Sequence, residues 1–213
     1  MVRRFRKSIS SLIPLKKFIY LISPSKIYKR FYIDLEKTLA SNKVKFFQLR
    51  FKTYSKRKIK EIGKKIKKIT SRYKVKLIIN DSAEITKLIN ADGCHLGQSD
   101  DRPKYARSIL KKKIIGITCH NSKKLIKLAI KNKASYIAIG SFFKSKLKPR
   151  ASKANLKILK WSKKNIKIPI VAIGGINDKN YYKLINAGAN YIALSSFIWK
   201  NPKLKPEHAI KKF

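Results

Sequence analysis

The stretch NSKKLIKLAIKNKASYIAIG, residues 121–140, contains a helix pattern followed directly by a strand pattern. Its first part places Leu125, Leu128 and Ala129 on one side of an expected helix, because helical neighbours recur every three or four residues. Its last part, SYIAIG (135–140), is a short apolar run that ends at a glycine, which is typical of a strand buried on both faces. This order predicts one helix–strand unit of an α/β fold.

The same alternation continues along the chain in both directions. Apolar runs of strand length recur at residues 18–23, 44–49, 75–80, 92–97, 113–118, 135–140, 168–175 and 190–196. Segments with helical spacing lie between them, and in FYIDLEKTLASNK (31–43) we expect Ile33, Leu35 and Leu39 on one stripe. Eight such units in about 200 residues predict a single (β/α)8 TIM barrel, since a doubly wound sheet usually has fewer strands.

The length and composition fit one globular domain. The chain has 213 residues, and its apolar fraction of 44% suffices for a complete core. We expect a basic N-terminal extension over residues 1–16 and the barrel over residues 17–213. The apolar centre of the extension is too short for a secretory signal. Two cysteines do not make a disulfide framework, and no apolar run approaches the roughly 18 residues of a membrane span, so we expect a cytoplasmic protein.

The chain is strongly basic, with 54 Lys and Arg against 10 Asp and Glu and a net charge of +44. Dense positive charge attracts phosphate and would suit a nucleic-acid-binding protein. The cations are nevertheless spread from end to end, and aromatic residues are not interleaved with them as stacking platforms. This distribution favours solvated helix faces produced by coding bias. Nucleic-acid binding is kept as a remote alternative.

Polar residues follow the second apolar run. Because active sites of TIM barrels lie where strands end, residues directly after an apolar run are candidates for the site. In QLRFK (48–52), Gln48, Arg50 and Lys52 occupy alternate positions, and a period of two sends them to the same face. The sequence therefore predicts a cluster of polar and positive groups at this strand end.

Acidic residues follow the next two runs, although acids are rare in this chain. Asp81 comes after the third run and Asp100 after the fourth. Two carboxylates at neighbouring strand ends suit Mg²⁺, which prefers oxygen ligands and leaves its remaining positions to water and phosphate. Taken singly, either acid could instead cap a helix. We expect Asp92 at the opposite end of its strand and Asp101 at the start of the following helix.

Small residues end the last two runs. Gly174 and Gly175 would let backbone N–H groups approach a ligand, and Ser195 and Ser196 precede a short helix. TIM barrels often bind phosphate between these two loops, so a phosphate site is expected there.

Two Cys-His dipeptides, at 94–95 and 119–120, raise the alternative of a zinc site. Adjacent side chains in a strand point to opposite faces, and the chain has no compact C-x-x-C spacing, so zinc is not expected. His120 is expected to have a structural or hydrogen-bonding role.

With these motifs assembled, the chain resembles the thiamine phosphate synthase family, within the wider group that includes the TenI-type thiazole tautomerases. The resemblance covers residues 18–198. It rests on QLRFK, IINDS, DGCHLGQSD, GITCHNS, GSFFKSKLKP and VAIGGI, in the family's order. It implies a transferase that couples 4-amino-2-methyl-5-hydroxymethylpyrimidine diphosphate with thiazole phosphate, giving thiamine phosphate and pyrophosphate, with Mg²⁺ as cofactor.

The resemblance also implies roles for individual residues. The residues implied to hold the pyrimidine diphosphate are Gln48, Arg50, Lys52, Asn80, Thr118 and Lys148, of which Arg50, Lys52 and Lys148 are the catalytic ones. The residues implied to bind Mg²⁺ are Asp81 and Asp100. The residues implied to hold the thiazole phosphate are Ser145, Gly175, Ser195 and Ser196. Expected partners are these small substrates, with no specific nucleic acid and no membrane, and a homo-oligomer is compatible with the sequence.

The sequence departs from the family pattern at three positions. Phe51 stands where the family has Glu, Lys144 where it has Pro, and Leu147 where it has a Thr. Two related functions therefore stay open as alternatives, a thiazole tautomerase and an inactive protein that binds thiazole phosphate. The tautomerases commonly lack the acids that this chain keeps as Asp81 and Asp100, which favours the synthase.

Overall fold

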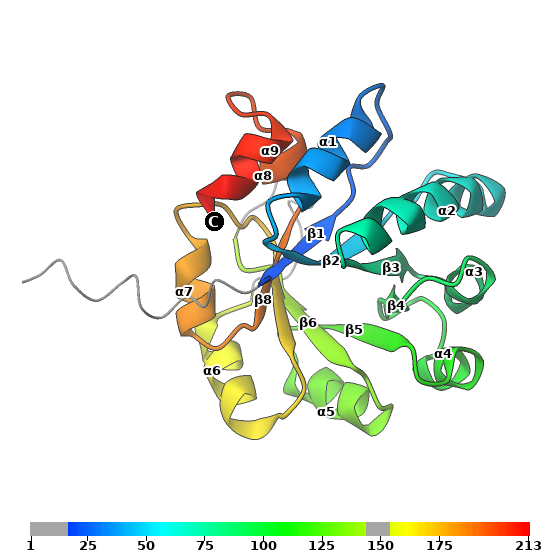
Figure 1. The fold of residues 1–213 in the computed structure, drawn as a ribbon. Coiled ribbons are helices and arrows are strands. Elements are labelled where there is room, and N and C mark those ends of the chain that lie inside the picture. The colour runs from blue at the N-terminus through cyan, green and yellow to red at the C-terminus, as the bar shows by residue number, and fades with distance from the viewer. Residues whose placement is uncertain (1–16, 144–153) are drawn as a thin grey trace, which may run out of the picture.

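Parallel strands form a closed barrel at the centre of the molecule (Figure 1). The computed structural model describes residues 17–143 and 154–213, and within these residues the barrel has eight strands in sequential order, with β8 paired to β1. The strands are β1 (Ile19–Ile22), β2 (Val44–Leu49), β3 (Lys76–Asn80), β4 (Gly93–Leu96), β5 (Ile114–His120), β6 (Tyr136–Gly140), β7 (Ile170–Ile173) and β8 (Tyr191–Leu194). The predicted TIM barrel is confirmed.

Helices surround the barrel and connect successive strands (Figure 1). They are α1 (Phe31–Leu39), α2 (Lys56–Arg72), α3 (Ala83–Leu88), α4 (Pro103–Leu110), α5 (Lys123–Lys131), α6 (Leu156–Asn165) and α7 (Tyr181–Asn186), followed by α8 (Ser196–Trp199), α9 (Pro206–Ala209) and the 3₁₀ helix η1 (Ile210–Lys212). Several helices begin at a polar cap whose side chain accepts a backbone N–H three residues later, which satisfies a donor that the helix leaves unpaired. These caps are Ser55, Ser82, Ser122 and Asn155.

The core has two layers because successive side chains of each strand point to opposite faces. The inner layer fills the barrel and consists of Tyr20, Ile22, Phe46, Ile78, Tyr136, Ala138, Val171 and Ala193. The outer layer lies between the strands and the helices and includes Leu21, Phe47 and Leu77, all fully buried. A side chain that continues the phase of the inner layer past the end of its strand therefore lies at the mouth of the barrel.

Two helix positions differ from the sequence expectation. On α1, Leu35 and Leu39 are buried as expected, but Ile33 is 54% exposed. On α5, Ala129 is buried, whereas Leu128 is 50% exposed and Ile126 is completely buried in its place. The expectation was therefore wrong for Ile33 and Leu128, since each lies outside the stripe that its helix turns toward the barrel.

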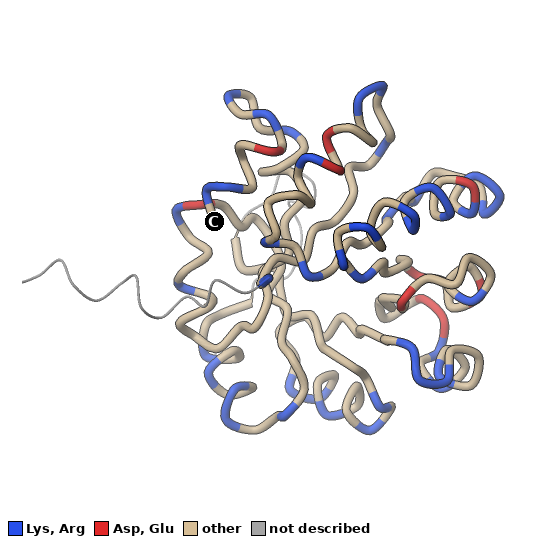
Figure 2. Tube along the Cα trace, in the orientation of Figure 1, with Lys and Arg blue, Asp and Glu red and all other residues tan. Residues whose placement is uncertain are grey.

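The outer surface is basic on all sides. Figure 2 shows Lys and Arg on helices and loops around the whole barrel, with few acids between them. None of the helices in the described part of the chain combines the length and apolar character needed to cross a bilayer.

Candidate active site

The polar face of QLRFK lies at the C-terminal end of β2. Gln48 continues the phase of the inner-layer residue Phe46 and is buried, and its Nε2 donates a hydrogen bond to Asn80 Oδ1 at 3.0 Å. Arg50 and Lys52 follow the strand on the alternate positions and are half-buried and exposed, respectively. Gln48 and Asn80 thus join the ends of β2 and β3 inside the mouth.

Ser23, which was not nominated from the sequence, ties the loop of Arg50 to its neighbours. The Arg50 backbone N–H donates to Ser23 Oγ at 3.0 Å, and the Ser23 N–H donates to the Gln48 carbonyl at 2.9 Å. Ser195 Oγ in turn donates to the Ser23 carbonyl at 3.2 Å. The buried Ser23 therefore connects the ends of β1, β2 and β8. Its only sequence signal is its place as the last residue of the first apolar run.

Two carboxyl groups meet at the ends of β3 and β4. Burial, followed by a hydrogen bond to the neighbouring Asp100 carboxyl, raises the pKa of Asp81 to about 6, while the charges of Lys52 and Arg50 oppose the rise. The Gly97 N–H donates to Asp100 Oδ2 at 2.6 Å, which holds the Asp100 carboxyl beside the end of β4. The structure therefore brings together the two acids and two of the three cations that the sequence nominated.

The donor set fits Mg²⁺. Two carboxylates this close repel each other unless a proton or a cation lies between them, and Mg²⁺ is commonly held by one or two carboxylates together with water and substrate phosphates. No group of three or more His, Cys, Asp or Glu with metal-binding geometry occurs among the described residues. Asp81 and Asp100 would accordingly supply only part of a coordination sphere.

The other acids of this region have structural contacts. Helix α3 is capped by Ser82, and α4 begins after Arg102, so neither Asp81 nor Asp100 is a helix cap. Asp101 Oδ2 accepts the Ala83 N–H at 3.0 Å. The expectation that Asp101 starts the following helix was therefore wrong, because the loop folds back and Asp101 stabilises the start of the preceding helix α3.

Asp92 lies at the far end of β4, as expected. It precedes the strand, and its carboxylate accepts hydrogen bonds from Lys67 Nζ, Lys76 Nζ and the Leu77 N–H. These contacts place Asp92 at the end of the barrel opposite the mouth.

A hydrogen-bonded chain runs through the barrel interior to the mouth. His95 Nδ1 lies 2.8 Å from Tyr136 Oη, and His95 Nε2 lies 2.8 Å from Thr118 Oγ1. Tyr136 Oη also lies 2.8 Å from Tyr20 Oη. Burial lowers the pKa of His95 to about 4, so the imidazole is neutral. Thr118 is half-buried, and Gln98 Nε2 donates to its carbonyl oxygen.

His95 was not nominated from the sequence, where its Cys-His dipeptide suggested only a zinc ligand. Cys94 and Cys119 are both buried in the outer layer, whereas His95 points into the barrel and His120 is exposed at the end of β5. The alternation of side chains along β4 could have placed His95 in the interior. Its partners could not have been found this way.

The ends of β7 and β8 form the remaining wall. Gly174 and Gly175 have φ values of 109° and 60°, a region that glycine adopts without strain. A Cβ on Gly174 would lie 2.0 Å from Ser141 Oγ, so this position requires glycine for space as well. Ser195 and Ser196 follow β8, and Ser196 begins α8. Ser145 and Lys148, like Lys144 and Leu147, lie outside the described residues.

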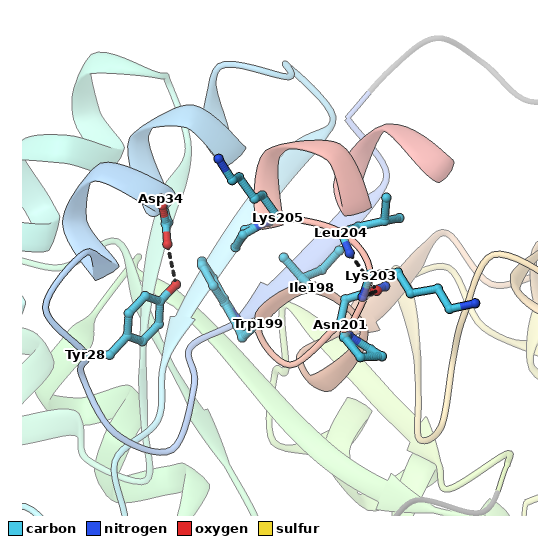
Figure 3. Close-up of a pocket in the computed structure, with 10 residues that line it drawn as sticks. Tyr28, Asp34, Ile198, Trp199, Asn201, Lys203, Leu204 and Lys205 are labelled. Atoms are coloured by element: carbon cyan, nitrogen blue, oxygen red, sulfur yellow. Dashed lines mark hydrogen bonds between the residues drawn. The ribbon is translucent and has the colours of Figure 1, made fainter.

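A separate hollow of about 420 Å³ lies between α1 and the segment that runs from α8 to α9 (Figure 3). It is lined partly by Tyr28, Asp34, Trp199 and Lys205, and Tyr28 Oη donates to Asp34 Oδ2 at 2.9 Å. None of the nominated residues in the described part of the chain lines it, so it is distinct from the candidate site.

Comparisons with known proteins agree on one family. The sequence model of the family described as thiamine monophosphate synthase matches residues 19–198. The thiamine-phosphate synthase of Pelagibacter ubique (strain HTCC1062) is 52% identical over 198 residues, which cover 92% of this chain and 96% of that protein. The thiamine-phosphate synthase of Clostridium acetobutylicum is 39% identical over 190 residues, which cover 88% and 89%.

Solved structures agree with the sequence relatives. Thiamine phosphate pyrophosphorylase from Pyrococcus furiosus superposes with a TM-score of 0.82 at 27% identity, covering 92% of this chain and 93% of that one. A 3-hexulose-6-phosphate synthase from Salmonella typhimurium, with a TM-score of 0.69 and 13% identity, shares the fold alone.

Proposed function

Because the chain belongs to the thiamine monophosphate synthase family, we propose that its barrel mouth couples hydroxymethylpyrimidine diphosphate with thiazole phosphate to give thiamine phosphate and pyrophosphate. The chain is accordingly a transferase of thiamine biosynthesis. One observation carries the assignment of the site. The carboxyl groups of Asp81 and Asp100 lie together, close enough to Arg50 and Lys52 to feel their positive charges.

The reaction needs stabilisation of charge more than it needs a protein nucleophile. The C–O bond to the diphosphate breaks with its electron pair leaving on pyrophosphate, and positive charge develops on the electron-rich pyrimidine. The lone pair of the thiazole nitrogen then forms the new C–N bond. Fixed groups that favour the departing anion, together with correct placement of the thiazole, are sufficient to accelerate these steps.

Arg50 and Lys52 are proposed to stabilise the departing pyrophosphate, together with Lys148. The position of Arg50 is supported by its backbone contact with Ser23, and by the effect of its charge on the pKa values of Asp81 and His95 at the mouth. Arg presents a planar fork that matches phosphate oxygens, and Lys adds a compact positive charge. Loss of one such electrostatic contact commonly costs roughly 10²–10³ in rate.

Asp81 and Asp100 would hold Mg²⁺ at the same mouth. When bound, the ion would neutralise negative charge that develops on the diphosphate. Because the two carboxylates lie near Arg50 and Lys52, they would place the ion beside the cations proposed to hold the diphosphate. The proposal that the enzyme depends on Mg²⁺ is supported by the fit of this carboxylate pair.

The two heterocycles are proposed to occupy opposite walls. Gln48, Asn80 and Thr118 would hold the pyrimidine, which is supported by their inward phase on β2, β3 and β5. Gly175, Ser195 and Ser196 would hold the thiazole phosphate through backbone N–H groups and hydroxyls, with Ser145. We expect these small molecules as the partners, with no specific nucleic acid or membrane, and the cytoplasm as the compartment. The carboxylate pair favours this synthase assignment over a thiazole tautomerase.

The test is incubation of the purified protein with both phosphorylated heterocycles and Mg²⁺, with thiamine phosphate and pyrophosphate measured together. Equal amounts of the two products are expected from wild type. Arg50→Ala and Asp100→Ala should each lower kcat/KM by roughly 10²–10³. Arg72→Ala is the matched control, because it removes the same charge from an exposed ion pair at the end of α2. Formation of no thiamine phosphate by wild type would contradict the proposed function.

A further inference from the structure

Tyr20, Tyr136, His95 and Thr118 form one continuous hydrogen-bonded chain, with 2.8 Å between successive polar atoms. Tyr20, Tyr136 and His95 are each at least nine-tenths buried, and Thr118 alone reaches the mouth. A neutral imidazole carries one N–H proton, on either Nδ1 or Nε2. The hydrogen bonds that link these four side chains can therefore run in only two directions.

In the first orientation every proton points toward the mouth. Tyr20 donates to Tyr136, Tyr136 donates to His95 Nδ1, and His95 Nε2–H donates to Thr118 Oγ1. The Thr118 hydroxyl proton is then left over, and it lies where water or substrate can accept it. Among the described residues, no other hydrogen bond involves this hydroxyl.

In the second orientation every proton points inward, and the unpaired proton is the one on the Tyr20 hydroxyl. Tyr20 is 2% exposed, and within the described residues its hydroxyl has no polar partner besides Tyr136. A buried donor without an acceptor is unfavourable enough to bias the two orientations by roughly tenfold to a hundredfold. The first orientation is therefore favoured, because its unpaired proton lies at the mouth and not in the barrel interior.

The fold makes room for this chain at a specific position. A Cβ on Gly116 would lie 1.9 Å from Tyr136 Cζ and 2.2 Å from its hydroxyl oxygen, so the glycine of β5 is required for the tyrosine ring of β6. The ring of Tyr136 stacks on His95 with a centroid separation of 5.6 Å. The position of the Tyr136 hydroxyl is thus set by packing as well as by hydrogen bonding.

We propose that Tyr20 and Tyr136 hold His95 in its Nε2–H tautomer and thereby make the Thr118 hydroxyl a hydrogen-bond donor toward the substrate. Tyr136 and His95 are positioning residues, since they act through Thr118. This inference rests on the proposed function, because it concerns the wall that would hold the pyrimidine diphosphate. The acceptor on that substrate is a ring nitrogen or a diphosphate oxygen.

The test reads the tautomer directly in the substrate-free wild-type protein. In ¹⁵N-histidine-labelled protein, the His95 signals are assigned by comparison with His95→Gln. We expect Nε2 to carry the proton and Nδ1 to be unprotonated at neutral pH. A protonated Nδ1 with an unprotonated Nε2 would overturn the proposal. This measurement does not depend on turnover. An unexpected tautomer can therefore be distinguished from failure of the proposed function.

Variants test whether the orientation matters to the substrate. Tyr136→Phe should weaken the tautomer preference and lower kcat/KM for the pyrimidine diphosphate roughly tenfold. Thr118→Val should lower it by a similar factor, and Thr118→Ser should restore most of it. Tyr191→Phe, which removes a hydroxyl at the inner layer on β8, is the matched control and should change neither measurement. Equal activity of Thr118→Val and wild type would also overturn the proposal.

Discussion

Lys67 Nζ lies 2.6 Å from Asp92 Oδ2 at the end of the barrel opposite the candidate site. The Leu77 N–H donates to the same oxygen at 2.9 Å, and Lys76 Nζ lies 3.3 Å from the other oxygen. Burial acts to raise the pKa of Asp92, but Lys67, the Leu77 amide and Lys76 together hold it below its ordinary value. These three groups therefore favour the charged form of the Asp92 carboxylate in the folded state.

We predict that Asp92→Asn lowers the free energy of unfolding by about 1 kcal/mol near neutral pH, with allowance for solvent screening of a partly exposed pair. A depressed folded-state pKa stabilises the protein above the unfolded pKa, and this stabilisation is lost as the pH falls through the folded value. Urea unfolding measures the free energy of unfolding of wild type and variant. The difference between the two proteins, the gap, should be smaller at about pH 3 than at about pH 7. An equal gap at both pH values would contradict this account. Activity of the folded variant should be unchanged.

The acid pair at the mouth has the opposite pH dependence. Because the pKa of Asp81 is raised to about 6, its contribution to stability is fully present below the unfolded pKa and is lost as the pH rises through about 6. A divalent cation can replace the proton between the carboxyls. We therefore predict that Mg²⁺ alone raises the melting temperature more at about pH 8 than at about pH 5. Asp100→Asn is the control and should remove most of the difference, and equal shifts at both pH values would contradict the metal assignment.

The barrel, and the proximity of Asp81 and Asp100, could be predicted from the sequence. Strand periodicity and chain order place consecutive strands side by side in a parallel barrel, so residues that follow the third and fourth apolar runs must meet at one mouth. This is why Asp81 and Asp100 could be paired without a structure. The phase of Gln48 could be predicted for the same reason, because alternation needs only a strand and its direction.

Contacts that depend on tertiary packing could not be predicted. Tyr20 and Tyr136 are 116 positions apart in the sequence, and their hydroxyl contact depends on the space left by Gly116. Asp101 lies beside α3 only because its loop folds back. Ile33 and Leu128 are apolar residues next to the buried stripe, and the composition of a helix alone does not decide which apolar residue faces the barrel.

Gln48 offers a test of the inner wall, because its Nε2 donates to Asn80 Oδ1 at 3.0 Å and Gln48 is 3% exposed. Gln48→Met keeps the length of the side chain and removes the donor. We predict a loss of about 1 kcal/mol in the free energy of unfolding and a roughly tenfold lower kcat/KM for the pyrimidine diphosphate. Denaturant titration and steady-state kinetics measure the two effects. Wild-type kinetics in this variant would remove Gln48 from the proposed site.

Phe51, which stands where the family pattern has Glu, packs away from the mouth. It is 6% exposed in the outer layer, and its ring stacks on Tyr54 with a centroid separation of 4.7 Å. Restoring the family residue with Phe51→Glu would bury a carboxylate among apolar groups, so we predict a loss of about 3 kcal/mol or more in the free energy of unfolding. Phe51→Leu, which stays apolar, should cost less.

Catalysis should respond differently from stability in these variants. Arg50 and Lys52 flank Phe51 on the opposite face, so the kcat/KM of the folded fraction of Phe51→Glu should stay within a few-fold of wild type when measured well below its melting temperature. Thermal unfolding and kinetics on the same preparation separate the two effects. A gain in kcat/KM without loss of stability would show that the side chain at position 51 reaches the substrate, and the outward packing of Phe51 would then not describe the working enzyme.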